Sequence, residues 1–496
     1  MPAQPTLMIA QSEEQLQQLL QYVTGPEAQT RRAADVELTL FRRVLALGGT
    51  LLRLFFVTRA TPRPAEPVCG PDGVVRQYHD HRPCTYYSVF GKMTFLRHAY
   101  TAPGHAVCCP LDAALSLPER VYSDLLSEWG SYGSTDSAFW ETQTWLERVL
   151  GLDLSVQALE TTLAEAAADV EAFYEQPLAA TASPPCEPPA PEATVLVVQA
   201  DGKGVPIVPA VPAEREARRR KGRPADSKRE AMVTAVYTIA PYPRTPDDLV
   251  AALLREGEPP PPDQRPRPQG KEQRATFAGK AVALTRVAQR AAQRESPAIV
   301  HRVALTDGAV SLQTQMQQQF LDYTPVLDLI HATEYLWEAA SALLGERHPD
   351  RTAWVREHLQ LLLGGDVGEV ITRLAAAAAE PGRTAVQRRA VERTRGYYER
   401  NQAFMRYDQY LAQGWPIGTG VVEGACGHLV KDRCDQAGMR WTKAGAQAVL
   451  DLRAVRLNGH WDRYWRWHRE RQHAARYGTT LSRAAPAEAL LLDQAA

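Results

Sequence analysis

Three acidic residues, Asp201, Asp307 and Glu423, stand in sequence contexts that suit carboxylate metal ligands. Each aspartate follows an apolar run typical of a buried strand and precedes a glycine. Glu423 lies at an expected helix start, where the positive end of the helix favours an ionised carboxylate. Each context alone has an ordinary explanation, because Asp-Gly is a common turn pair and first-turn glutamates stabilise helices. Together, in this order, the three acids favour a metal site.

The glycines around Glu423 bear on how closely a ligand can approach it. They occupy positions 418, 420, 424 and 427. Because glycine lacks a Cβ atom, we expect backbone or a large ligand to come close to the Glu423 carboxylate. Either Thr419 or Gly420 is the expected N-cap of the helix.

Three carboxylates suit the cutting of a phosphodiester bond. This reaction requires an activated oxygen nucleophile and relief of charge on the leaving oxygen, and two Mg²⁺ ions about 4 Å apart supply both. Hard cations prefer oxygen ligands such as carboxylates, water and the phosphate itself. We expect Asp201 to bridge two Mg²⁺ ions and Asp307 and Glu423 each to complete one, with Mn²⁺ able to substitute.

The elements that must position these acids follow from apolar runs and turns. An apolar run over 194–200 predicts a buried strand, and Asp201 to Gly204 is read as a turn that makes it the first strand of a hairpin. Further strands are predicted at 205–208, 232–239 and 298–305, with a helix over 271–294. An acid on a first strand, a second after a fourth strand and a third on a late helix is the layout of a ribonuclease-H-like α/β fold.

The rest of the chain is expected to flank and interrupt this core. The predicted order is an N-terminal helical region (1–66) beginning near Ser12, a small β segment of short strands (67–117), a helical region (118–176), a proline-rich linker (177–193), the first part of the core (194–331), an all-helical insertion (332–411), the second part of the core with the Glu423 helix and C-terminal helices (412–471) and a tail (472–496).

Within the helical region, residues 138–159 have the layout of a helix-turn-helix, with Gly151 in the turn and Ser155 as the cap of the second helix. Such helix pairs also occur without DNA. Four cysteines further upstream raise the question of zinc, but their spacing does not match paired zinc ligands and favours packing roles. They are Cys69, Cys84, Cys108 and Cys109.

Composition sets wider limits. The formal net charge is −1, so the overall balance neither favours nor excludes nucleic acid. The sequence has no run of eighteen apolar residues that would predict a membrane span, and its N-terminus lacks a signal-peptide pattern. Seven cysteines without a pairing pattern indicate a reducing compartment. We therefore expect a cytoplasmic protein with no membrane partner.

Several stretches, taken together and in order, resemble the ISKra family of bacterial insertion-sequence transposases, which is related to the Mutator-like group. These stretches are 88–91, 110–118, 200–204, 304–308, 326–337, 422–433, 438–441 and 451–454. The resemblance spans nearly the whole chain. It implies DNA transposition of the DDE type, in which the element's ends are cut and their 3′-hydroxyls are joined to target DNA.

The resemblance also assigns site residues. Asp201, Asp307 and Glu423 match the family's acidic triad, and 332–411 matches the inserted helical domain of the wider group. Asp328 and His331 match an aspartate-x-x-histidine motif, which implies that His331 lies near the scissile phosphate or organises the site. The alternative for His331 is a neutral histidine buried beside a strand.

One position departs from the pattern of DDE enzymes, many of which carry a basic residue seven positions after the glutamate. That position holds Val430 here, and Lys431 comes one residue later. The candidate DNA-binding residues are Arg218, Arg219, Arg220, Lys221, Lys431, Arg433, Arg440 and Trp441. A basic run such as 218–221 is also consistent with an ordinary solvated loop.

The expected partners are DNA, comprising terminal inverted repeats and a target, and further copies of the chain, because transposases join two ends in one complex. Residues 1–176 are expected to recognise the repeats, and the protein would act at the nucleoid. Two rival functions are open: a ribonuclease-H-like nuclease that only hydrolyses, and a domesticated DNA-binding protein whose metal site is no longer used.

Overall fold

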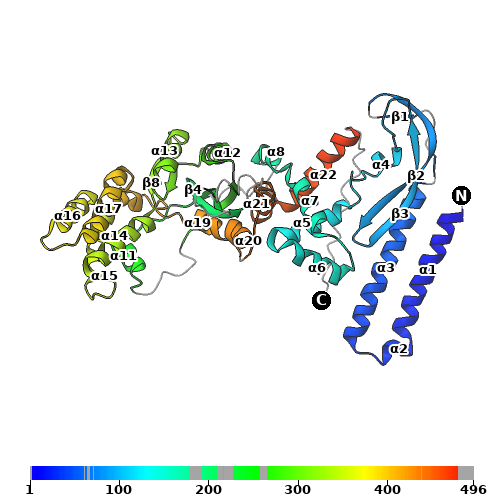
Figure 1. Ribbon diagram of the computed structural model, residues 1–496, viewed down its shortest axis with the longest axis horizontal. Coiled ribbons are helices and arrows are strands. Elements are labelled where there is room, and N and C mark those ends of the chain that lie inside the picture. Colours follow the sequence, from blue (N-terminus) through cyan, green and yellow to red (C-terminus); the bar gives the residue numbers. More distant parts are fainter. Residues whose placement is uncertain are drawn as a thin grey trace. The chain divides into compact units, whose positions relative to one another are not determined.

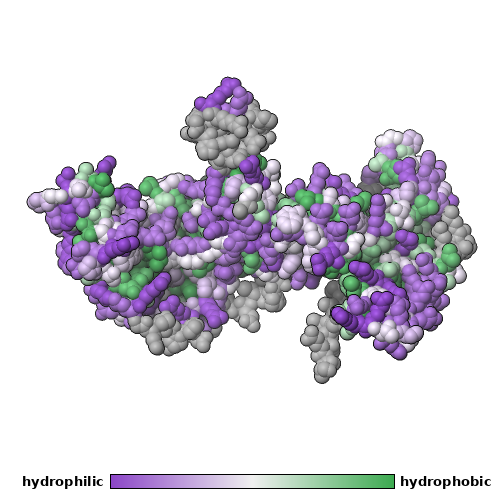
Figure 2. Space-filling model, turned by 60° about the horizontal axis from the view of Figure 1, so that its bottom comes forward, coloured by the Kyte–Doolittle hydropathy of each residue, from purple (hydrophilic) through white to green (hydrophobic). Residues whose placement is uncertain are grey.

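The computed structural model describes residues 3–60, 62–63, 68–70, 72–178, 192–208, 216, 220, 227–256, 265–436 and 438–478. The chain divides into two compact units (Figure 1). The first comprises Met1–Asp169 together with Tyr464–Ala496, and the second comprises Val170–Arg463. No helix among the described residues is long and apolar enough to cross a membrane. Figure 2 shows hydrophobic residues in separate patches on a mainly hydrophilic surface.

The first unit begins with a helical hairpin formed by α1 (Ala3–Thr24), the short α2 (Pro26–Gln29) and α3 (Ala33–Ala60) (Figure 1). The expected start of the first helix near Ser12 is wrong, because α1 already begins at Ala3. Ser12 lies inside α1, where its hydroxyl donates a hydrogen bond to the Met8 carbonyl (2.9 Å) rather than capping a helix start.

The β segment is a long hairpin rather than a set of short strands. It consists of β1 (Val68–Cys69), β2 (Val75–Ser88) and β3 (Gly91–Thr101), paired antiparallel in that order. Phe56 of α3 stacks on Phe95 of β3, with ring centroids 4.4 Å apart. The four cysteines of this region are free thiols, and they do not form a metal-ligand group among the described residues.

The helices that follow are α4 (Pro110–Ala114), α5 (Asp124–Asp136), α6 (Phe139–Leu150) and α7 (Val156–Ala167). The two consecutive helices expected here, with a glycine between them, are present as α6 and α7. Gly151 ends α6 in the left-handed conformation (φ 68°), and the Ser155 hydroxyl caps α7 by accepting a hydrogen bond from the Ala158 amide (3.1 Å). The C-terminal helix α22 (Trp461–Tyr477) also contributes to this unit, so the expected tail begins inside a helix, and 479–496 lie outside the described residues.

The second unit is built on a mixed five-stranded sheet. Its strands are β4 (Val195–Ile207), β5 (Ser227–Ile239), β6 (Gln269–Thr276), β7 (His301–Thr306) and β8 (Thr324–Leu327). In spatial order they run β6-β5-β4-β7-β8. The first three strands in sequence pair antiparallel, whereas β7 and β8 run parallel to β4.

The turn expected at Asp201 to Gly204 is wrong, because β4 continues through it and pairs with β5 as far as Ile207. Gly202 and Gly204 make room for cross-strand side chains instead of bending the chain. A Cβ atom on Gly202 would lie 2.5 Å from a carboxylate oxygen of Glu230, and one on Gly204 would lie 3.2 Å from Lys228.

The helix expected over 271–294 is also wrong in its first part, which forms strand β6 at the sheet edge before α12 (Lys280–Ala292) begins. This strand was not predicted because it consists largely of polar residues. Glu272 is buried in β6 and pairs with Arg290 of α12 (2.7 Å), with Arg294 close by (3.3 Å). Such burial of charge requires partners distant in sequence, which hydrophobic patterning does not reveal.

Alternate residues of β4 face two different cores. Leu196, Val198 and Ala200 pack with α12 and with α13 (Val310–Gln319). Val195 and Val197 pack on the other face, against the helical insertion. That insertion has the expected helical character and comprises α14 (Leu329–Leu344), α15 (Arg351–Leu363), α16 (Val367–Ala379), α17 (Ala385–Asn401), a short 3₁₀ helix (Gln402–Phe404) and α18 (Tyr407–Ala412).

The remaining helices of the second unit complete the frame around the sheet. They are α8 (Val170–Tyr174), α11 (Pro246–Leu253), α19 (Gly420–Ala425), a π-helix (Cys426–Lys431), α20 (Asp432–Cys434) and α21 (Lys443–Leu457). Helix α19 carries Glu423 in its first turn, as expected.

Candidate functional site

Asp201 lies in β4, and Asp307 directly follows the neighbouring parallel strand β7. The register of β4 and β7 pairs Gln199 with Leu305 as its last pair. Continued by two residues, it sets Asp201 beside Asp307 at the carboxyl end of β7. Because adjacent strands lie about 4.8 Å apart, this register can bring the two carboxylates to one small site.

The same edge of the sheet holds a third aspartate. The register of β7 and β8 ends with Thr306 beside Leu327, and one further residue sets Asp328 beside Asp307. Asp328 is fully buried and is the N-cap of α14. Three aspartates therefore follow one another across β4, β7 and β8.

The residues Asp201 and Asp307 are partly exposed, and their carboxylates accept few hydrogen bonds. For Asp201, Oδ1 accepts from the Gly202 amide (2.6 Å) and Oδ2 accepts from the Cys426 thiol (3.3 Å). For Asp307, Oδ1 accepts from the Ala309 amide (2.9 Å). A carboxylate has about four acceptor positions, so both groups retain capacity for further ligands.

Gly308 fixes the chain directly after Asp307. Its φ of 83° is disfavoured for residues with a Cβ atom. A Cβ atom there would also lie 2.7 Å from Leu327 and 2.9 Å from the Tyr397 hydroxyl, which donates to the Asp307 carbonyl (2.8 Å). Glycine is therefore required at this position to set the Asp307 backbone.

Glu423 reaches the site from α19, and its side chain is 41% exposed. Thr419 is the N-cap residue, but its hydroxyl does not cap the helix backbone. The hydroxyl lies 2.7 Å from Oδ2 of Asp328 and 2.5 Å from Oε1 of Glu423. The hydroxyl therefore contacts both carboxylates, can donate its single hydrogen to either, and links the sheet edge to Glu423.

Asp328 acts as an organiser of this cluster. Its Oδ1 accepts from the backbone amide (2.7 Å) and the Nδ1 atom (3.1 Å) of His331, while Oδ2 accepts from the amide and hydroxyl of Thr419. Burial alone would raise the pKa of Asp328, but the hydrogen bonds from His331 and Thr419 lower it below its ordinary value.

His331 is partly exposed in the first turn of α14, and the interpretation as a buried neutral histidine is wrong. Its hydrogen bond to Asp328 raises the pKa of His331 to about 9, against the opposing effect of burial. Nδ1 of His331 lies 4.0 Å from Oε1 of Glu423. A cationic imidazole beside these acids suits contact with a phosphate better than ligation of a metal.

Asp328, His331 and Glu423 place one ligand atom each within 4.8 Å of one another, and they are the group of this kind found among the described residues. Asp201 and Asp307 lie outside that group, although the register, continued past its last pairs, sets Asp307 beside Asp328 and Asp201 beside Asp307. The oxygens of Asp328 are already engaged by His331 and Thr419. Of this close group, Glu423 therefore offers the most accessible ligand atoms.

Two buried glutamines fasten the Glu423 helix to the sheet. Gln199 of β4 donates to the Gly418 carbonyl (3.1 Å) and accepts from the Val422 amide (3.0 Å). Gln273 of β6 donates to the Val421 carbonyl (3.0 Å). Sequence reasoning missed both. For Gln199 a signal was present, because it is a polar residue within an otherwise apolar strand.

The π-helix after α19 affects which residues of this segment are exposed. A π-turn inserts one extra residue into a helix, so the position eight after Glu423 takes the face that the seventh would have in a regular α-helix. The eighth position is Lys431, which is exposed, whereas Val430 is fully buried. Lys431, and not Val430, therefore lies on the exposed face of this helix.

The other candidate DNA-binding residues divide into three sets. Arg218, Arg219 and Lys221 lie outside the described residues. Arg220 is exposed and pairs with Glu216 (2.6 Å). Arg440 is exposed as well.

The expectation that Arg433 and Trp441 contact DNA is not supported. Both side chains are buried, with the Arg433 guanidinium 4.7 Å from the Trp441 ring centre. Trp441 also donates from its indole nitrogen to the Cys434 carbonyl (3.1 Å), and its backbone pairs with Ile207 at the end of β4. These contacts give Arg433 and Trp441 a structural role.

The glycines around Glu423 leave open space rather than relieving crowding within the chain. A Cβ atom on Gly420 or Gly427 would meet nothing within 4 Å, and one on Gly424 would only touch His428 at 3.9 Å. The nearby Cys426 is a buried free thiol. Burial, with the Asp201 carboxylate adding to it, raises the pKa of Cys426, which keeps it protonated and suited to packing.

Comparison of the chain with models of known protein families gives no match, and comparison with curated proteins gives none either.

Proposed function

We propose that this protein is a DNA transposase of the DDE type, with a ribonuclease-H-like core that contains an all-helical insertion. The order of the five strands supports this fold. Numbered within the sheet, they lie 3-2-1-4-5, with the first three antiparallel and the last two parallel to the first. The helices α14 to α18 enter between β8 and the Glu423 helix, where such an insertion is expected.

The observation that carries the proposal is the shared register of Asp201 and Asp307 beside the Glu423 helix. The register of β4 and β7, continued two residues past its last pair, sets these two partly exposed carboxylates side by side. Gln199, two residues before Asp201, holds the first turn of the Glu423 helix through the Val422 amide. Asp307 and Glu423, which are 106 and 222 positions after Asp201 in the sequence, thus belong to elements that adjoin the Asp201 strand.

The donor set fits hard divalent cations, because its accessible atoms are carboxylate oxygens. Asp201, Asp307 and Glu423 would hold two Mg²⁺ ions, or Mn²⁺ in their place. When bound, the ions would relieve phosphate charge and favour formation of hydroxide from water. Thr419 and Asp328 would keep the Glu423 carboxylate directed toward the site, through the hydroxyl that contacts both carboxylates.

The cationic groups near the acids would hold the DNA backbone. His331 would bind a phosphate oxygen beside the acids, since its Nδ1 is engaged by Asp328 and Nε2 can donate to a ligand. Lys431 and Arg440, both exposed, would contact phosphates further along the strand. We further propose that two ends are held by an oligomer, that residues 1–176 recognise the terminal repeats, and that the protein acts in the cytoplasm at the nucleoid.

A strand cleavage and joining assay tests the proposal. The protein would be incubated with Mg²⁺, target DNA and DNA that carries the flanking ends of its own gene. Wild type is expected to cut at the ends and join the 3′-hydroxyls, and Glu423→Gln is expected to do neither. Glu369→Gln is the matched control, because this side chain on α16 is similarly exposed (49%) and lies in the insertion.

Other outcomes would select the rival functions. Cleavage without joining would favour a nuclease that only hydrolyses. Specific binding of the ends without any cleavage by wild type would favour a DNA-binding protein. Activity that persists in Glu423→Gln would show that the third carboxylate is a different residue.

A further inference from the structure

The helical hairpin of the first unit exposes a set of large apolar residues on both of its long helices. Each of these side chains is 41–54% exposed. They are Ile9, Leu16, Leu20 and Val23 on α1 and Phe41, Val44, Leu51 and Phe55 on α3, and we call them the apolar face. Along each helix they recur at intervals of three, four or seven residues, the spacing of a helix-packing seam.

The helix geometry puts all eight residues on one side of the hairpin. In α1, Leu20 is rotated about 100° from the buried Leu19, and Gln18 is rotated by the same angle in the opposite direction. In α3, Arg43 faces α1, because its guanidinium lies 4.3 Å from the centre of the Tyr22 ring. Around the α3 axis, Val44 and Ala46 are rotated in opposite directions from Arg43.

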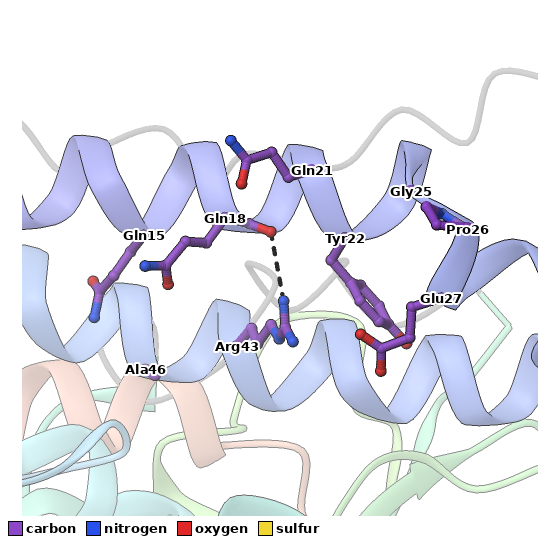
Figure 3. Close-up of a pocket in the computed structure, with 9 residues that line it drawn as sticks. All are labelled: Gln15, Gln18, Gln21, Tyr22, Gly25, Pro26, Glu27, Arg43 and Ala46. Carbon is purple, nitrogen blue, oxygen red and sulfur yellow. Dashed lines mark hydrogen bonds between the residues drawn. The ribbon is translucent and has the colours of Figure 1, made fainter.

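Gln18 and Ala46 line one pocket between the two helices (Figure 3). That side of the hairpin is polar, with Gln15, Gln18 and Gln21 around the pocket and Arg43 donating to the Gln18 carbonyl. Since Gln18 and Ala46 share this side, the residues rotated the other way on each helix share the opposite side. The apolar face is therefore continuous across both helices.

The hairpin has little interior of its own to account for its length. Among its described residues, those that are buried are Ser12, Leu19, Tyr22, Ala28 and Phe56. Phe56 packs on β3 through Phe95 rather than on α1. A two-helix hairpin with so few buried residues and a continuous apolar face is expected to pack against further helices.

We infer that the apolar face docks on the same face of a second copy of this chain, so that two hairpins form an intermolecular four-helix bundle. Because the face is apolar on both helices, it can cover the same face of another copy in a two-fold arrangement.

The area also suits a dimer. A 22-residue helix is about 33 Å long, and two helices side by side are about 20 Å wide, which gives a face on the order of 650 Å² in projection. Interlocking side chains add to this area, which approaches the roughly 800 Å² per partner of a standard interface. The inference stands on the hairpin alone and does not depend on the proposed function.

Sedimentation velocity on the full chain without DNA tests the dimer. Wild type is expected to sediment as a dimer, with twice the 54.9 kDa mass of one chain. Leu16→Glu/Leu20→Glu is expected to be monomeric, with a dimer dissociation constant at least 100-fold higher. Gln18→Glu/Gln21→Glu is the matched control, because it adds the same charge to the polar side of the same helix. The control is expected to remain dimeric, and circular dichroism should show equal helix content in all three proteins.

Three results would overturn the inference: a monomeric wild type at 50 μM (about 3 mg/ml), a Leu16→Glu/Leu20→Glu protein that stays dimeric, or equal weakening by both double variants. Should the double-glutamate variant lose helix content, the single variant Leu20→Gln decides the matter. It is expected to weaken the dimer at least tenfold while keeping wild-type helix content, and an unchanged dimer would count against the proposal.

Discussion

Gln199 of β4 accepts a hydrogen bond from the backbone amide of Val422, the residue before Glu423, across 223 positions of sequence. Through the same side chain it donates to the Gly418 carbonyl. The strand that carries Asp201 is therefore joined directly to the helix start that carries Glu423. This bond is the structural basis for treating the two acids as parts of one site.

Replacing Gln199 by methionine should weaken the connection between β4 and the start of α19. The change keeps the side-chain length but leaves the buried Val422 amide and the partly buried Gly418 carbonyl without their partner. An unsatisfied buried polar group costs about 1–3 kcal/mol, so the free energy of unfolding should fall by about that amount, as measured by urea denaturation. Gln318→Met, on the exposed side of α13, should leave it unchanged. In addition, the Mg²⁺ concentration for half-maximal cleavage should rise only in Gln199→Met, a shift that simple destabilisation would not produce.

Gly308 and Gly420 should respond in opposite ways to alanine. Gly308→Ala forces a positive φ on a residue with a Cβ atom and crowds Leu327 and Tyr397, which should cost about 1–3 kcal/mol of unfolding free energy. Gly420→Ala should leave the melting temperature within about 1 °C of wild type or raise it slightly, because its Cβ atom meets open space. Equal melting temperatures for the two variants would show that the backbone after Asp307 is not constrained as described.

The pair of Asp328 and His331 should make stability depend on pH at the alkaline end. In the folded state the pKa of His331 is raised to about 9, from the ordinary histidine value of 6.5. Its contribution to stability is therefore complete below pH 6.5 and is lost as the pH rises through 9. The melting temperature of His331→Gln should lie below that of wild type at pH 6, and the gap should close by pH 10. A gap that is constant from pH 6 to pH 10 would contradict the ion pair.

Lys431 should contribute to DNA binding and Val430 should not. Lys431→Ala is expected to weaken binding of all DNA sequences similarly and to reduce the slope of log affinity against log salt by about 1, the value for one lost phosphate contact. Val430→Ala removes a fully buried side chain, so it should lower stability while leaving that slope unchanged. Titrations by fluorescence anisotropy at several salt concentrations distinguish these effects. An unchanged slope in Lys431→Ala would remove this residue from the interface.

Local sequence signals predicted the parts of the structure that depend on neighbours in the chain. The caps at Gly151 and Ser155, the apolar strands before Asp201 and Asp307, and the helix at Glu423 all follow from turn chemistry and periodicity. The aspartates at strand ends could therefore be identified, although the hairpin proposed for Asp201 was wrong.

The contacts that assemble the site could not be predicted in this way. The Thr419 hydroxyl meets Asp328, 91 positions away, and no periodicity encodes that encounter. Strand β6 was missed because the charge of Glu272 is paired with Arg290 of α12 and with Arg294 just after that helix. In the sequence alone, a buried ion pair cannot be distinguished from exposed charged residues. The π-turn that exposes Lys431 likewise depends on packing rather than on composition.

The central claim, that Asp201, Asp307 and Glu423 form one divalent-metal site, is tested most directly by titrating the protein with Mn²⁺ and following the free ion by electron paramagnetic resonance. Wild type should bind Mn²⁺, and Asp201→Asn, Asp307→Asn and Glu423→Gln should each weaken binding at least tenfold. Asp322→Asn, an exposed residue before β8, should bind like wild type. Wild-type affinity in all three site variants, or no binding by wild type, would contradict the account.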